Sequence, residues 1–93
     1  AYGRAALDGY RAEGIDTRFV ATTPGVPSGV ALIAVSAGDG QNAIVVAPGA
    51  NAHLSDRDIA AAAPAFDAAD AVVVSLEIED DAVAAAVAAG HAR

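Results

Sequence analysis

The stretch SGVALIAVSAGDGQNAIVVAPGAN, residues 28–51, decides the fold expected for the middle of the chain. Two apolar runs, 29–36 and 42–47, flank Gly38-Asp39-Gly40. An Asp-Gly step between alternating apolar residues is a strong local signal for a β-hairpin. Pro48-Gly49 ends the second run, because proline donates no hydrogen bond to a strand ladder. The stretch therefore predicts two antiparallel strands joined by a short turn.

The two predicted strands carry apolar side chains on a shared face. Alternate residues of a strand point to the same side. Ala31, Ile33 and Val35 therefore share one side, and Ile44 and Val46 can face them across the hairpin.

Upstream of the hairpin, the sequence predicts a helix and a strand. Residues 2–13 have a helical apolar pattern, and Gly14 supplies a stop that can adopt positive φ. Residues 15–22 alternate apolar and polar side chains and predict a strand. Residues 24–27, Pro-Gly-Val-Pro, predict a turn or short linker.

Downstream of the hairpin, a helix is predicted over 56–63. Gly49 and Asn51 are turn residues able to adopt positive φ. Ser55 has the side chain of an N-cap, and Asp58 three residues later makes a short variant of the capping box. Pro64 predicts a kink or restart, with helix continuing to about residue 69.

The last third of the chain predicts a buried strand followed by a helix. Residues 71–76, Ala-Val-Val-Val-Ser-Leu, are apolar on both faces, which is typical of a parallel strand covered on both sides. Asp80-Asp81 favours a helix start, and Val83 and Val87 are expected to face the core. Alternating helices and strands predict an α/β fold.

Composition excludes several classes of protein. The chain has 93 residues, net charge −7, five scattered arginines, no lysine and no cysteine. This argues against a nucleic-acid or anionic-membrane surface, a disulfide framework and a thiolate metal site. No apolar run is long enough to span a membrane, so the expected location is the cytoplasm. The chain has no methionine and begins at Ala1, which predicts a piece of a longer protein.

Several motifs in order resemble the ribokinase-like (PfkB) family of carbohydrate kinases. They are the segment RAEGIDT at 11–17, the hairpin, Gly49-Ala50-Asn51 and Ser75-Leu76-Glu77. The resemblance is greatest to the lid of the ribokinases. It implies a partial ribokinase-like α/β fold, with parallel-sheet strands, flanking helices and a β-hairpin lid. Residues 1–22 would lead into the lid, 23–48 would form it, and 49–93 would belong to the main kinase domain.

The resemblance also implies substrate contacts. In the family a Leu-Glu pair ends the strand before the last helix, and its glutamate touches the sugar, which assigns that role to Glu77. Its position just past the end of a buried strand fits a ligand crevice. The other interpretation is a loop carboxylate that caps the helix at Asp80. Ala31, Ile33 and Val46 would line the lid over the sugar, or else be plain core residues of a small sheet.

The resemblance implies a parent enzyme that transfers the γ-phosphate of ATP to a sugar hydroxyl, with ribose the first choice of sugar. ATP and Mg²⁺, with K⁺ as an optional further cation, would be its cofactors, and the lid would join two subunits. The family's general base, anion hole and nucleotide site lie outside this sequence. No catalytic, cofactor-binding or metal-binding residue is therefore assigned, and this segment alone is expected to be inactive. The alternatives are a fructokinase or nucleoside kinase of the same family, and a non-catalytic, self-associating module.

Overall fold

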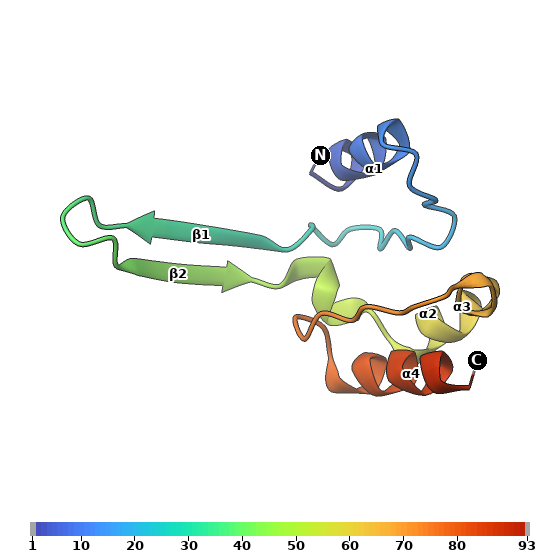
Figure 1. The fold of residues 1–93 in the computed structure, drawn as a ribbon. Helices are drawn as coiled ribbons and strands as arrows, with labels where there is room; N and C mark the ends of the chain where they lie inside the picture. The colour runs from blue at the N-terminus through green and yellow to red at the C-terminus, as the bar shows by residue number, and fades with distance from the viewer. Residues whose placement is uncertain (1, 93) are drawn as a thin grey trace.

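The computed structural model describes residues 2–92, which form a long hairpin attached to a group of helices (Figure 1). The overall dimensions are 49 × 26 × 26 Å, because the hairpin extends away from the helices. In chain order the elements are α1 (Tyr2–Ala12), β1 (Val30–Val35), β2 (Asn42–Ala47), the 3₁₀ helix η1 (Gly49–His53), α2 (Asp56–Ala61), α3 (Ala63–Ala68) and α4 (Asp80–His91).

The predicted hairpin is confirmed. β1 and β2 pair antiparallel, with Ala31 opposite Val46 and Ile33 opposite Ile44. The Ser36 N–H donates to the Gln41 carbonyl at 2.7 Å, which closes the turn. Gly40 adopts φ +75°, the left-handed conformation that a side chain would disfavour.

The helix at the N-terminus also matches the prediction. Gly14 follows it with φ +79°. The Ile15 N–H donates to the Tyr10 carbonyl at 2.9 Å, and the Gly14 N–H donates to the Arg11 carbonyl at 3.1 Å. These two bonds form a Schellman motif, which satisfies carbonyls that the end of the helix would leave unpaired.

The predicted strand at 15–22 is wrong. This segment forms a turn in which the Val20 N–H donates to the Thr17 carbonyl at 3.1 Å. The Asp16 carboxylate also accepts the Arg18 backbone N–H at 3.0 Å. Local bonds of this kind compete with a strand ladder, and within residues 2–92 the sheet consists of β1 and β2 alone.

The predicted cap of α2 is confirmed. The Asp58 carboxylate accepts the Ser55 backbone N–H at 2.9 Å and the Ser55 hydroxyl at 3.2 Å, within a reciprocal capping box. Pro64 lies in the first turn of α3, and the chain restarts there after α2 ends at Ala61, as expected.

Removing this cap should destabilise the chain. We expect Ser55→Ala to lower the free energy of unfolding by about 1 kcal/mol, since the substitution removes the hydroxyl that bonds to the Asp58 carboxylate in the capping box. Urea unfolding followed by circular dichroism measures the change. Arg57→Ala, at an exposed position of the same helix, is the control, and an equal loss in both variants would contradict the capping role.

The small core lies on α4, on a different face from the one predicted. Ala82 is fully buried and Ala86 is 4% exposed; of the two valines expected to face the core, Val83 is half-buried and Val87 is 45% exposed. α4 packs against α2 and α3, and the residues that it buries are the alanines Ala82 and Ala86. Small side chains let these short helices approach closely but bury little area each.

The predicted buried strand at 71–76 is absent from the described residues. The segment is extended but pairs with no strand. Val73 is 96% exposed, so its side of the segment has no cover, and Leu76, where the chain begins to bend, is 82% exposed. A parallel strand needs a neighbour for its backbone groups, and residues 2–92 supply none. The α/β class therefore holds only as helices with one antiparallel hairpin, and the predicted parallel sheet is not confirmed.

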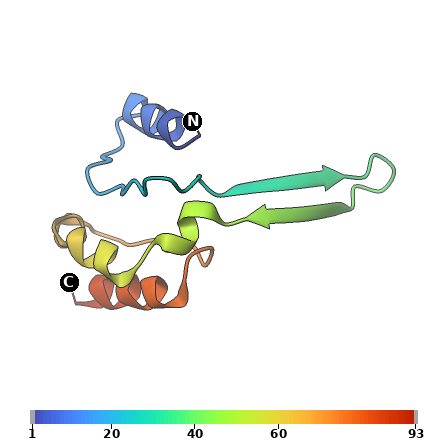
Figure 2. The same cartoon turned by 180° about the vertical axis from the view of Figure 1, so that it is seen from behind.

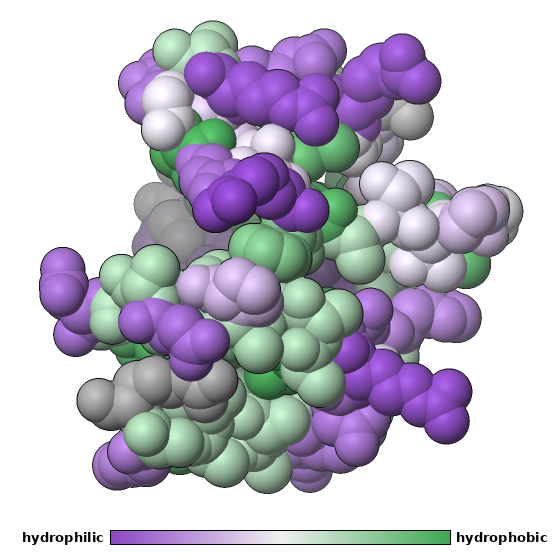
Figure 3. Space-filling view, turned by 90° about the vertical axis from the view of Figure 1, so that its right-hand side faces the viewer, coloured by the Kyte–Doolittle hydropathy of each residue, from purple (hydrophilic) through white to green (hydrophobic). Residues whose placement is uncertain are grey.

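Helices α2, α3 and α4 pack together and form a helical body beside the hairpin. Figure 2 shows the same arrangement from behind, with α1 apart from the α2–α4 group. Seen from the end away from the hairpin, apolar surface gathers over the alanine-rich α2–α4 and polar surface over α1 (Figure 3). No helix within residues 2–92 has the length and apolar character of a membrane span.

Candidate functional site

The hairpin carries three of the four residues predicted to contact a sugar. Ala31 and Ile33 lie on β1, and Val46 lies on β2 directly opposite Ala31. All three are exposed, with Ile33 at 56% and Val46 at 63%. The face that they share is therefore not packed against the rest of residues 2–92, and the interpretation as plain core residues is wrong for this part of the chain.

The opposite face of the hairpin is also apolar and open. Leu32 pairs with Val45, and these side chains are 72% and 68% exposed. A two-stranded hairpin with both faces in water is marginally stable. Packing of further protein surface against either face would therefore stabilise the hairpin.

Glu77 lies in the bend between the extended segment and α4. Its backbone N–H donates to the Ser75 hydroxyl oxygen at 3.2 Å, and its side chain is exposed. The residue at the N-cap position of α4 is Glu79, and Asp81 accepts the Ala82 N–H at 2.9 Å. The alternative role of Glu77, as a cap for this helix, is not observed.

The structure places Glu77 and the hairpin face with Ala31, Ile33 and Val46, predicted to be a lid, on different parts of the molecule. Glu77 belongs to the bend at the start of α4, whereas Ile33 lies on the projecting hairpin (Figure 1). No hydrogen bond joins Glu77 to the hairpin within residues 2–92. These residues can act on one ligand only if the ligand lies between the hairpin and the helical body.

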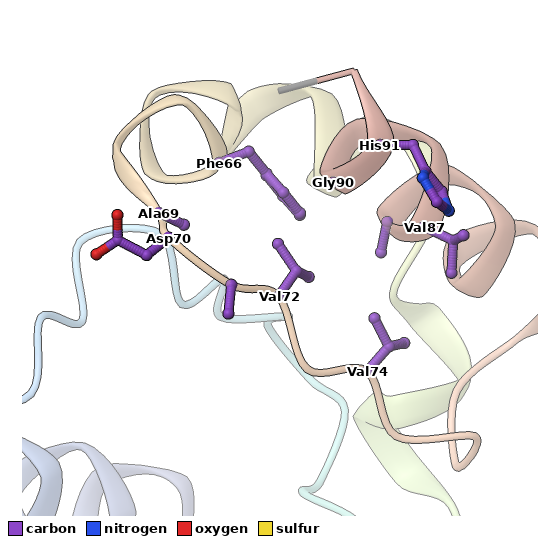
Figure 4. A pocket seen from close by; sticks show the side chains of 10 residues that line it. Phe66, Ala69, Asp70, Val72, Val74, Val87, Gly90 and His91 are labelled. Carbon is purple, nitrogen blue, oxygen red and sulfur yellow. The ribbon is translucent and has the colours of Figure 1, made fainter.

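A cavity of about 300 Å³ lies between α3, the extended segment and α4. Phe66, Val72 and Val74 point into it, and the Asp70 carboxylate points away (Figure 4). Its lining is mainly apolar and does not include Glu77. Val72 and Val74 face the helices and Val73 faces outward, so the segment has the alternation of a strand covered on one side.

An exposed charge pair orders the turn before the hairpin. The Arg18 guanidinium lies 2.8 Å from an Asp16 carboxylate oxygen and 5.4 Å from the centre of the Phe19 ring. Hydrogen bonds from the Arg18 side chain, and secondly from its backbone N–H, lower the pKa of Asp16. Because both side chains are largely exposed, solvent screens the pair and its effect on stability is small.

This charge pair gives a titration prediction. We expect NMR titration to place the pKa of Asp16 below its usual value of about 3.9, and Arg18→Gln to raise it toward that value. A lowered folded-state pKa stabilises the fold above the unfolded-state value, and this contribution is lost as the pH falls through the folded-state value. The pKa of Asp39, lowered first by the Gln41 backbone N–H, is the control because Arg18 does not contribute to it. An Asp16 pKa that is unchanged in Arg18→Gln would contradict the pairing.

His53, Asp56 and Asp58 lie around the start of α2. The structure uses the Asp58 carboxylate in the cap of α2. The sequence did not predict that Gly29 lies close to Pro48 and Asn51, or Gly49 close to Pro27 and Ser28, at the base of the hairpin. The nearby signals were Ser28-Gly29 just before the first strand and Pro48-Gly49 just after the second.

Comparison with known proteins identifies the class. The model of the pfkB family carbohydrate kinases matches residues 1–93, and the chain belongs to that family. The crystal structure of Sa239 is 35% identical, with a TM-score of 0.83 over 92% of this chain. The chain spans only 28% of the length of Sa239. No curated protein matches the sequence.

Proposed function

We propose that this chain is the lid-bearing segment of a sugar kinase that transfers the γ-phosphate of ATP to a sugar hydroxyl. Membership of the pfkB family carbohydrate kinases carries the proposal. The hairpin would be the lid, with Ala31, Ile33 and Val46 facing the sugar. Glu77 would accept hydrogen bonds from sugar hydroxyls.

The exposed apolar surface supports a larger parent protein. Soluble monomers seldom expose large contiguous apolar patches, yet both hairpin faces and the outer side of 71–76 are open here. In the proposed parent, neighbouring strands would pair with 71–76 and complete a parallel sheet. Glu77 would then lie just beyond the carboxyl end of a sheet strand, where open α/β sheets bind their ligands.

The two apolar faces suggest a division of labour on the hairpin. The Ile33 face would exclude water from the sugar without competing for its hydroxyls. The Leu32 face would pack against the hairpin of a second subunit, which makes the parent a homodimer. Ribose is the proposed sugar, because the lid sequence resembles that of ribokinases most.

Phosphoryl transfer needs positioned phosphates, Mg²⁺ and a base for the attacking hydroxyl. The motifs that the family uses for these tasks do not occur in this sequence. ATP and Mg²⁺ would therefore be bound by other segments of the parent, and this chain would contribute the lid and one sugar contact.

An activity assay tests the proposal. We expect the complete kinase to release ADP from ATP when ribose is added, and this 93-residue chain alone to release none. Fructose and adenosine serve as competing substrates that distinguish the other family members. Absence of sugar-dependent ADP release from the complete protein would overturn the proposal.

A non-catalytic role as a self-associating module is the second candidate. The free edges of the two-stranded sheet favour it, since exposed strand edges can pair with another chain. Sedimentation of this chain at several concentrations separates the two, because a strictly monomeric folded chain would remove this candidate.

A further inference from the structure

The two connections of the hairpin touch where they meet the helical body. The Ala50 N–H, at the start of η1, donates to the Pro27 carbonyl oxygen at 2.8 Å. This bond ties the segment entering β1 to the segment leaving β2. Figure 1 shows these segments side by side at the base of the hairpin.

Glycine at two positions permits this contact. A Cβ atom at Gly29 would lie 2.5 Å from Asn51 Nδ2 and 2.7 Å from the Pro48 carbonyl oxygen. A Cβ atom at Gly49 would meet the Pro27 carbonyl oxygen and lie 2.9 Å from the Ser28 carbonyl carbon and oxygen. The neighbours of Gly49 are all backbone atoms, so no side-chain rotation could make room.

Other glycines of the chain do not have this role. Gly40, at the tip of the hairpin, adopts φ +75° and has open space where a Cβ would lie. At Gly40, glycine is therefore favoured by the backbone conformation alone and not by a close contact. Gly49 combines φ +52° with close backbone contact, and Gly29 has close contact without positive φ. The two requirements can therefore be tested separately.

We infer that Gly29 and Gly49 are positioning residues that lock both hairpin connections into one joint and so set where the hairpin lies relative to the helical body. If the two connections were independent, each could change its backbone conformation alone and so alter the position of the hairpin. Joined through the bond between Ala50 and Pro27, the connections turn only together. This inference rests on the proposed function in one respect: the hairpin must be the lid for its position to affect sugar binding.

Amide exchange tests the joint without any assay of activity. In this chain the Ala50 amide should exchange slowly, and Gly29→Ala should speed its exchange about tenfold or more. Gly40→Ala, strained but free of contacts, should leave Ala50 unchanged. Exchange at Ala82 and Ala86 on α4 reports whether each variant keeps its helical core. An Ala50 amide that is equally protected in Gly29→Ala would overturn the inference.

A second variant covers the case in which Gly29→Ala fails to fold. Combining Gly29→Ala with Asn51→Ala removes one of the two close neighbours of the new Cβ, so protection at Ala50 should be partly restored. No such relief is available for Gly49→Ala. If the double variant protects the Ala50 amide no better than Gly29→Ala alone, the inference is also contradicted.

Kinetics of the complete kinase test the positioning role. We expect Gly29→Ala to raise the KM for the sugar about tenfold while the KM for ATP stays constant, and Gly40→Ala to change neither. If Ala50 loses protection but the sugar KM is unchanged, the joint exists and its role in lid position is refuted. If no variant or wild type shows sugar-dependent turnover, the proposed function fails, and the exchange result still decides the joint.

Discussion

Glu77→Ala in the complete kinase should raise the Kd for the sugar about tenfold to a hundredfold and leave ATP affinity unchanged. Glu77 is exposed, and its carboxylate has no partner within residues 2–92. A carboxylate that accepts bonds from sugar hydroxyls in a closed site contributes about 1.5–3 kcal/mol. That range corresponds to the expected change in Kd. Isothermal titration with ribose, and separately with an ATP analogue, measures both affinities.

The matched control for this prediction is Glu79→Ala. Glu79 lies two residues away at the N-cap position of α4 and makes no side-chain cap bond. We expect that variant to bind the sugar normally. Because Glu77 does not cap α4, its removal should also leave the melting midpoint of the protein nearly unchanged. A lowered midpoint with unaltered sugar affinity would assign Glu77 a structural role only.

Ile33→Asp in the complete kinase should also raise the Kd for the sugar by about tenfold or more. Ile33 lies on the proposed sugar face, opposite Ile44. A charged side chain there would have to lose its hydration when the lid closes, which is costly without a partner. Water held by the aspartate would also compete for the sugar hydroxyls, which would weaken sugar binding further.

Leu32→Asp is the control, since Leu32 is the neighbouring residue on the other face and is also exposed. We expect this variant to keep its sugar affinity and to weaken self-association in sedimentation experiments. Equal loss of sugar affinity in both variants would contradict the assignment of the two faces. Unchanged affinity in both would contradict the hairpin's role as a lid.

Local signals in the sequence predicted the local structure. The turn of the hairpin, the stop at Gly14, the capping box of Ser55 and Asp58, and the helix starting at Asp80 all depend on bonds between near neighbours. Residues a few positions apart carry enough information to specify such bonds.

Predictions that needed distant partners fared differently. The strand expected at 71–76 requires neighbouring strands, and residues 2–92 offer none. The strand expected at 15–22 gave way to the local bonds of Asp16 and Arg18. The buried face of α4 was misjudged because valine is more apolar than alanine, whereas the close approach of α2 selects small side chains.

The candidate site shows the same division. The motif at 75–77 located a candidate residue, but neither its hydrogen-bond partner nor its distance from the lid follows from sequence. The contact between Gly29 and Asn51 joins residues on either side of the hairpin, so the local sequence pattern does not predict it.

A structure of the complete kinase with ribose bound tests the central claim most directly. The account predicts the hairpin folded over the sugar, Ile33 and Val46 facing it, and a Glu77 carboxylate oxygen within about 3 Å of a sugar hydroxyl. A sugar bound elsewhere, with Glu77 facing solvent and the hairpin packed away from the ligand, would contradict it.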